Sequence, residues 1–327
     1  MQSAHPLNVA DVRRSSAASL APEMRADVAL RSLLLEQLAA IESAAAGSPA
    51  GIDGERLHDL RVAVRRSRAL LDGCTGVFPA KVRSGFEASF EWASELTGPL
   101  RDHDVLLEAF AGYRTKQPAQ NRPCLDLLRR DLEREREPAR RAVCHGLAST
   151  RWRRALGAWR EYLETPVPRR SGLADARRPV IEVAAARIED ALGKVIGRGC
   201  RIAGDAPANA LHRLRLKAKR LRYLVEGFRS LYDPADAAQV IRALKQLQDY
   251  LGAHQDLEVH AAAIESYAVR IERGGRALTS LPAAVRTLAA TLLAECGALR
   301  SLYPQRFTAF DTPEHLAAFR ALARTSP

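Results

Sequence analysis

The sequence predicts an all-α protein, and three observations support this fold class. Apolar residues recur at spacings of three and four along almost the whole chain, which is the period of an amphipathic helix. Aromatic residues make up only 6% of the composition, whereas Ala and Leu are abundant. No run of alternating β-branched residues, the pattern typical of a half-buried strand, interrupts the helical segments.

Helical periodicity defines six segments in the first half of the chain, and Gly, Pro and Ser mark the turns between them. The predicted helices are Glu23–Ser43, Arg56–Asp72, Val82–Leu96, Asp104–Tyr113, Asp126–Gly146 and Trp152–Leu163. Gly98-Pro99 is predicted to separate the third segment from the fourth. Asp102 and Asp256 each follow a Gly-containing break and precede apolar residues, so both are predicted to cap helix N-termini.

The second half of the chain repeats the first at an offset of 154 residues. Residues 57–68, LHDLRVAVRRSR, return as residues 211–222, LHRLRLKAKRLR. The segment from Gly98 to Val105 returns from Gly252 to Val259 at the same offset. Two separate matches with one offset indicate an internal duplication. We therefore predict two pseudo-symmetric four-helix bundles related by a pseudo-two-fold axis.

The duplication also predicts how the chain is divided. Residues 1–21 are expected to be a flexible tail, 22–165 the first bundle and 178–327 the second. Residues 166–177, which are rich in Pro, Arg, Ser and Gly, are expected to link the bundles.

The composition is that of a globular protein, and its excess of positive charge is compatible with an anionic partner. The 327 residues are 47% hydrophobic and 27% charged, which is sufficient for a sizeable core. Fifty Lys and Arg against 38 Asp and Glu give a net charge of +12, and 44 of the fifty are Arg. Guanidinium groups bind phosphate bidentately, but a GC-rich genome also favours Arg, and composition alone does not choose between these explanations.

Membrane, secretory and disulfide-rich classes are not supported. No segment reaches the roughly 20 apolar residues of a membrane-spanning helix, and the N-terminus lacks the apolar core of a secretion signal. We therefore expect a cytoplasmic location and no membrane partner. The five cysteines form no CxxC pair, which argues against a disulfide scaffold and against a zinc ribbon.

The repeated helix carries a basic stripe directly beside its apolar stripe. On a helical wheel, the residues that border the apolar stripe are His58, Arg61, Arg65 and Arg68, and in the second copy His212, Arg215, Lys219 and Arg222. Cations in this position line a partly desolvated groove, where contacts with phosphate are stronger than in water. Because like charges on one face repel each other, their repetition favours an anion-binding role. Alternatively, these arginines pair with acids of neighbouring helices, for which Asp102, Asp104, Asp256 and Glu258 are the candidates.

These motifs resemble those of a known family, the CHAD (conserved histidine α-helical) domain. The resemblance rests on residues 57–68 and 211–223, and on the segments Gly98–Val105 and Leu251–Asp256. It implies two four-helix bundles that bind inorganic polyphosphate in a basic central groove, often at polyphosphate granules. Many members are fused to a CYTH triphosphatase domain, and no ExExK strand is found here, so the stand-alone form is expected.

The resulting functional prediction is a non-catalytic polyphosphate-binding protein without a metal or cofactor. The predicted binding residues are His58, Arg61, Arg65, Arg66, Arg68, Arg101, His212, Arg215, Lys217, Lys219, Arg220, Arg222 and Tyr223. Polyphosphate-granule proteins are further expected partners. Since Gln255 stands where the first copy has Arg101, the two halves need not bind equally.

Three interpretations of His58 and His212 are open. They could bind a divalent metal together with the acids of the repeated segments, but no HxxxH or HExxH spacing supports this. They could accept a phosphoryl group, but no acid–base partner is identified. We favour imidazoles that donate hydrogen bonds to phosphate or to a neighbouring carboxylate.

Other functions remain as alternatives. Non-specific binding to nucleic acid or to the nucleoid would also use the positive charge, but no base-stacking aromatic residues are interleaved with the basic stripe. An enzyme of phosphate chemistry would need an acidic metal-binding cluster, and neither this cluster nor a phosphate-binding Gly-rich loop is found. A purely structural bundle would not need the repeated stripe.

Overall fold

The computed structural model describes residues 20–46, 51–203, 206–207, 209–273 and 281–324. Its helices are α2 Ala26–Ala45, α3 Gly54–Gly73, α4 Ala80–Thr115, η1 Ala119–Asn121, α5 Arg122–Leu147, α6 Thr150–Glu164, α7 Val180–Gly199, α8 Ala210–Phe228, η2 Arg229–Leu231, α9 Pro234–Arg273, α10 Leu281–Ser301, α11 Tyr303–Thr308 and α12 Pro313–Ala323. No strand is found in these ranges, and the all-α prediction is confirmed. Residues 1–19 of the predicted tail lie outside the described residues.

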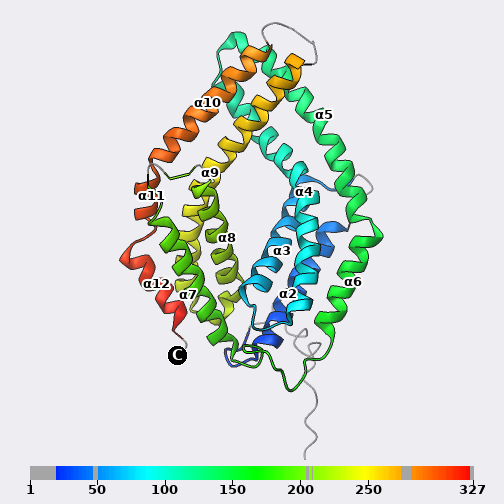
Figure 1. The fold of residues 1–327 in the computed structure, drawn as a ribbon, viewed down its shortest axis with the longest axis vertical. Helices are drawn as coiled ribbons and strands as arrows, with labels where there is room; N and C mark the ends of the chain where they lie inside the picture. Colours follow the sequence, from blue (N-terminus) through cyan, green and yellow to red (C-terminus); the bar gives the residue numbers. More distant parts are fainter. Residues whose placement is uncertain (1–19, 47–50, 204–205, 208, 274–280, 325–327) are drawn as a thin grey trace, which may run out of the picture.

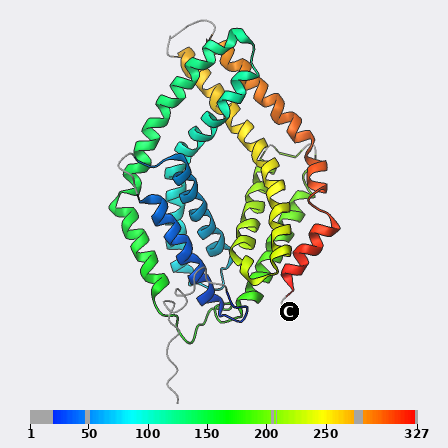
Figure 2. The same ribbon diagram turned by 180° about the vertical axis from the view of Figure 1, so that it is seen from behind.

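Each half of the chain contributes four helices that pack together at one end of the molecule. They are α2, α3, α4 and α6 in the first half, and α7, α8, α9 and α12 in the second. The two groups lie side by side, with α3 against α8 and α2 against α7 (Figure 1, Figure 2). One apolar cluster includes side chains of both groups, such as Leu60 and Leu214.

The long helices α4 and α9 extend beyond these groups to a second core at the other end of the molecule. Their C-terminal parts pack there with α5 and α10 around residues such as Phe110, Leu128 and Leu288. Lys116, the residue directly after α4, forms an ion pair with Glu295 of α10 at 2.9 Å. The two halves therefore meet at both ends, and they diverge in between (Figure 1).

α4 continues through Pro99, so the predicted break at Gly98-Pro99 is wrong. The buried residues Ala93 and Leu100 lie on both sides of the proline and belong to one packed helix face. Packing of that face outweighs the backbone hydrogen bond that proline removes. Asp102 consequently lies inside α4 and Asp256 inside α9, and neither caps a helix N-terminus, contrary to the prediction.

α3 and α8 approach each other closely at two glycines. A Cβ atom on Gly73 would lie 2.6 Å from Leu224 Cδ2, and one on Gly227 would lie 3.2 Å from Leu70 Cδ2. Both glycines, and both leucines, are 154 residues apart. In the same way α7 and α9 begin 154 residues after α2 and α4. The duplication itself stays a prediction from the sequence.

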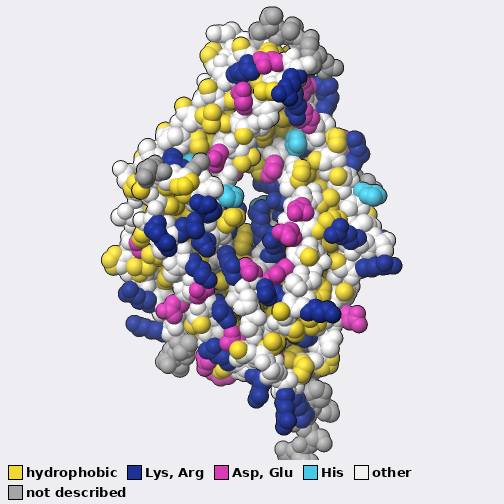
Figure 3. All heavy atoms as spheres, viewed as in Figure 1, with side chains coloured by type: hydrophobic (Ala, Val, Ile, Leu, Met, Phe, Trp, Pro, Cys, Tyr) yellow, Lys and Arg dark blue, Asp and Glu magenta, His cyan; other side chains and the backbone are white. Residues whose placement is uncertain are grey.

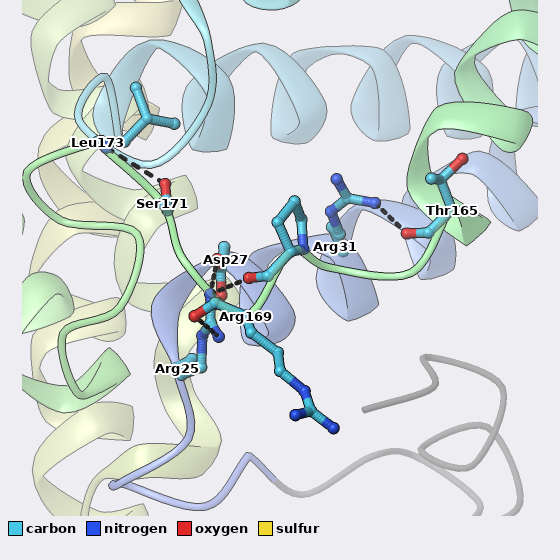
Figure 4. Close-up of polar contacts among 8 residues, drawn as sticks. Arg25, Asp27, Arg31, Thr165, Arg169, Ser171 and Leu173 are labelled. Carbon is cyan, nitrogen blue, oxygen red and sulfur yellow. Dashed lines mark hydrogen bonds and ion pairs between the residues drawn. The ribbon is translucent and has the colours of Figure 1, made fainter. Parts of the chain in front are cut away.

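The predicted linker, residues 166–177, is tied to the N-terminal end of α2 (Figure 4). Arg25 donates hydrogen bonds to two of its carbonyl oxygens, at 3.0 and 3.3 Å. Arg31 of α2 is only 5% exposed, and its Nη1 donates to the carbonyl oxygens of Tyr162 and Thr165, both at 2.6 Å. Arg31 thereby satisfies carbonyl groups that the C-terminal end of α6 would otherwise leave without a partner.

Candidate functional site

A groove of about 690 Å³ lies between the two halves of the chain, and we call it the front groove. α3 and α4 form one side of it, and α7 and α8 form the other. Nine Lys or Arg side chains and four Asp or Glu side chains line it. Basic side chains gather in the hollow at the centre of this face and beside it (Figure 3). The predicted site residues that line the front groove are Arg61, Arg65, Arg68, Arg215, Lys217, Lys219, Arg220 and Tyr223.

Four cations of the front groove form what we call the central cluster. They are Arg61 and Arg65 of α3, and Arg215 and Lys219 of α8. All four are half-buried. Among the residues that the structure describes, none of the four forms an ion pair with Asp or Glu, whereas neighbouring cations on the same helices do. The central cluster therefore keeps its positive charge available for a ligand.

Burial and mutual repulsion destabilise the charged forms of this cluster. Burial lowers the pKa of Lys219 to about 7, and the nearby Arg215, Arg65 and Arg222 add to the effect. Burial and then Arg65 lower the pKa of Arg61 to about 10. Burial lowers the pKa of Arg215 as well. The charges of Asp102 near Arg61, and of Asp256 near Arg215 and Lys219, offset these shifts only in part. Cations in such surroundings are stabilised by an anion that enters among them.

Two of the three arginines in the cluster, Arg61 and Arg215, differ in how they are held. Arg61 Nη1 donates to Thr97 Oγ1 at 2.7 Å and to the Ser94 carbonyl oxygen at 3.2 Å, both on α4. Arg215 Nε is buried and has no hydrogen-bond partner among the described atoms. A buried donor without a partner costs free energy, which an incoming acceptor would recover.

Three predicted site residues instead join α3 to α8 or lie beside that junction. Arg66 of α3 forms an ion pair with Glu226 of α8 at 3.0 Å, and Arg220 of α8 forms the reciprocal pair with Asp72 of α3. Arg222 lies 3.3 Å from Glu226. For these residues the structural alternative, pairing with acids, is correct. Arg220 still lines the front groove, but Arg66 and Arg222 do not.

Three further predicted site residues lie away from the front groove. His58 is exposed in the first turns of α3. His212 is half-buried, and its Nδ1 contacts Gln255 Oε1. Arg101 forms an ion pair with Glu108 of the same helix at 3.2 Å. None of the three lines the front groove, although the charge of Arg101 is close enough to Arg61 to help lower the pKa of that guanidinium.

α7 contributes two basic side chains that the sequence analysis missed. Arg187 and Lys194 line the front groove. Arg187 pairs with the buried Asp175, and Lys194 pairs with Asp190 at 2.5 Å. The two cations are seven residues apart on one helix face, like Arg61 and Arg68 on α3, so the same helical wheel applied to α7 could have found them.

A smaller groove of about 410 Å³ lies among α2, α3, α8 and α9, and we call it the back groove. These helices include the ones nearest the viewer in Figure 2. Arg66 and Arg229 line it together with Glu36 and Glu226, so the charges of its lining cancel. No member of the central cluster lines it. The buried Tyr223 lines both grooves.

Other kinds of site receive no support from the structure. Within the described ranges, no three His, Cys, Asp or Glu side chains are placed to hold a metal ion. In the same ranges, no helix is long and apolar enough to cross a membrane. The five cysteines are free thiols.

Comparisons with known proteins identify the family. A family model described as the CHAD domain matches residues 32–265. The crystal structure of the CHAD domain from the plant Ricinus communis is similar, with a TM-score of 0.69 and 24% identity, over 97% of each chain. PptA from Streptomyces chartreusis has a TM-score of 0.59 and 21% identity, over 87% of this chain and 100% of its own. No curated protein sequence matches. Because the family model covers more than half of its length, the chain belongs to the CHAD domain family.

Proposed function

We propose that this protein binds inorganic polyphosphate in the front groove without catalysing a reaction, and that it resides at polyphosphate granules in the cytoplasm. The observation that carries the proposal is the central cluster. Four half-buried cations face one groove, and no described carboxylate pairs with them. The resemblance of residues 57–68 and 211–223 to CHAD motifs implies the same ligand.

The chemistry of polyphosphate suits such a site. Each phosphate unit carries negative charge, and the chain is flexible and has no bases, so recognition needs only cations spaced along a track. Arginine offers a planar fork that binds two phosphate oxygens at once. The only aromatic side chain in the lining, that of Tyr223, is buried and cannot stack on a base. This favours polyphosphate over single-stranded nucleic acid.

Fluorescence anisotropy with labelled long-chain polyphosphate tests the proposal. We expect tight binding that unlabelled duplex DNA displaces poorly, because DNA cannot place its phosphates within the groove as a thin chain can. The logarithm of the affinity should fall with the logarithm of salt concentration with a slope of about −3 or steeper, as four phosphate contacts require. Salt-insensitive binding, or equal competition by DNA at equal phosphate concentration, would contradict the proposal.

Binding should also depend on pH through Lys219. Its pKa of about 7 in the free protein rises when phosphate comes close, so binding above pH 7 takes up a proton. Affinity should therefore fall as pH increases from 6 to 9, by about tenfold for each unit that the ligand raises this pKa.

The Lys219→Arg variant is the matched control, because arginine stays charged throughout this range and should flatten the profile. In the ligand-free protein, folding stability depends on pH in the opposite direction to binding affinity. Above pH 7 the unfolded chain, with an ordinary Lys pKa, binds more protons than the native state, so through this group folding stability rises with pH. Loss of affinity at high pH therefore cannot be assigned to unfolding through Lys219. A wild-type profile as flat as that of the variant would exclude Lys219 from the site.

A further inference from the structure

A second group of cations lies beside the central cluster, on α7 and α8. We call Lys194, Arg198 and Lys217 the α7–α8 patch. Burial lowers the pKa of Lys217, and the next causes are the charges of Arg198, Lys194 and Arg220, so each of these three cations lies near Lys217. Lys194 and Lys217 line the front groove.

The α7–α8 patch is poorly neutralised. Lys194 pairs with Asp190, whose charge also acts on Lys217, but no ion pair with a described acid is found for Arg198 or Lys217. Both of these residues are half-buried, so their charges are less well hydrated than those of free surface cations. Close, unpaired like charges repel one another, and a bound polyanion would relieve that repulsion.

The corresponding face of the first half carries no such patch. The residues 154 positions earlier than Lys194, Arg198 and Lys217 are all alanines, and they lie on α2 and α3. They are Ala40, Ala44 and Ala63. α2 and α3 border the back groove, just as α7 and α8 border the front groove.

The back groove offers a polyanion little attraction. Glu36 and Glu226 cancel the charges of its two arginines. The central cluster lines the front groove alone. The positive charge of the centre is therefore continuous with α7 and α8 on the front face, and it is not continued on the back face.

We infer that a polyphosphate chain held by the central cluster continues over the front face onto the α7–α8 patch and does not extend into the back groove. The inference rests on the proposed function and adds the path of the chain outside the centre. It also makes the α7–α8 patch a determinant of the polyphosphate length that the protein prefers to bind. A short oligomer fills the central cluster alone, whereas a longer chain also gains the contacts of the patch.

Lysine footprinting tests this path directly, because the protein has only six lysines. The free protein and its complex with long-chain polyphosphate are treated with an amine-acylating reagent, and each site is read by mass spectrometry. We expect protection of Lys219 in the centre and of Lys194 and Lys217 in the patch. Lys245 on α9, a helix that borders the back groove, should react equally in both samples, as should Lys81, which is exposed and does not line the front groove.

The pattern of protection separates failure of the inference from failure of the proposed function. If Lys219 is protected while Lys194 and Lys217 stay reactive, the centre binds polyphosphate and the path is wrong. If Lys245 is protected as strongly as Lys217, the chain also covers the back face, and the inference is again wrong. If polyphosphate protects no lysine, the proposed function itself fails.

A triple variant measures what the patch contributes. Lys194→Ala/Arg198→Ala/Lys217→Ala introduces the residue found at the equivalent positions of α2 and α3. Alanine is compatible with a helix. We expect about tenfold weaker binding of long-chain polyphosphate and a salt slope shallower by about 2. Binding of tripolyphosphate should change less than about twofold, since the central cluster is intact.

The matched control removes three exposed cations from the elements that border the back groove. It is Arg229→Ala/Arg242→Ala/Lys245→Ala, which changes the net charge by the same amount. We expect it to bind long-chain polyphosphate like the wild type. Equal losses in the two triple variants would mean that only net charge matters, and the proposed path would be wrong.

Discussion

Replacing the central cluster by alanine is expected to abolish tight polyphosphate binding. In Arg61→Ala/Arg65→Ala/Arg215→Ala/Lys219→Ala, four half-buried cations are lost from one groove. Affinity should fall by at least about a hundredfold, and the salt slope should become shallower by about 3, because four phosphate contacts disappear. Fluorescence anisotropy at two salt concentrations measures both quantities.

The same variant should fold as well as the wild type. The four cations repel each other and form no ion pair with a described carboxylate, so their removal relieves a cost that outweighs the two hydrogen bonds of Arg61 to α4. The ligand-free variant should therefore keep its helical circular dichroism and unfold at or above the wild-type temperature. This separates loss of a site from loss of the fold, and it is the pattern expected of residues selected for function rather than stability.

A charge-matched control decides whether position or total charge matters. Arg130, Arg154, Arg306 and Arg320 are exposed and lie on α5, α6, α11 and α12, outside the front groove. Replacing these four by alanine removes the same charge and should weaken binding by less than about threefold, through long-range attraction alone. If both quadruple variants lose affinity equally, the central cluster is not a site.

Arg31→Met is expected to cause the largest loss of stability. The buried guanidinium donates to the carbonyl oxygens of Tyr162 and Thr165, and it lies 4.5 Å from the centre of the Tyr162 ring. Met fills a similar space but cannot donate, so partly buried carbonyl groups at the C-terminal end of α6 lose their partner. We expect the free energy of unfolding to fall by about 3 kcal/mol. Urea denaturation followed by circular dichroism gives this value.

Arg160→Met is the matched control for that substitution. Arg160 of α6 also connects this helix to α2, through an ion pair with Glu42, and it forms a second ion pair with Glu164 of its own helix. Its side chain is 36% exposed, however, and exposed ion pairs contribute less than about 1 kcal/mol. If the two variants lost the same stability, the carbonyl contacts of Arg31 would not be what holds α2 to the end of α6.

The sequence predicted the helices well, because their periodicity is local information. The helix predicted over Arg56–Asp72 is α3, Gly54–Gly73, and the one predicted over Trp152–Leu163 is α6, Thr150–Glu164. The break at Gly98-Pro99 was wrong because local turn chemistry cannot weigh the packing of a whole face of α4. The N-cap roles predicted for Asp102 and Asp256 were wrong for the same reason.

The candidate site could be predicted in part. The position of Arg61 and Arg65 beside an apolar stripe placed them correctly in a groove. The helical wheel could not distinguish these two residues from Arg66, because only Arg66 pairs with an acid, and that acid, Glu226, is 160 residues away in the sequence. Likewise, nothing local in the sequence placed His58 outside the groove or set α7 opposite α4.

The reciprocal contacts of α3 and α8 have a consequence for how the two faces can differ. A contact in which Arg66 meets Glu226 and Arg220 meets Asp72 has the isologous form of a two-fold homodimer. In a homodimer every substitution occurs twice, so the grooves on the two faces of such an interface must change together. Here one polypeptide supplies both partners, and the covalent tether keeps them at high effective concentration. Lysine at position 194 can thus coexist with alanine at position 40. The front and back faces of the molecule can therefore carry different charges, which a symmetric pair of identical chains could not do.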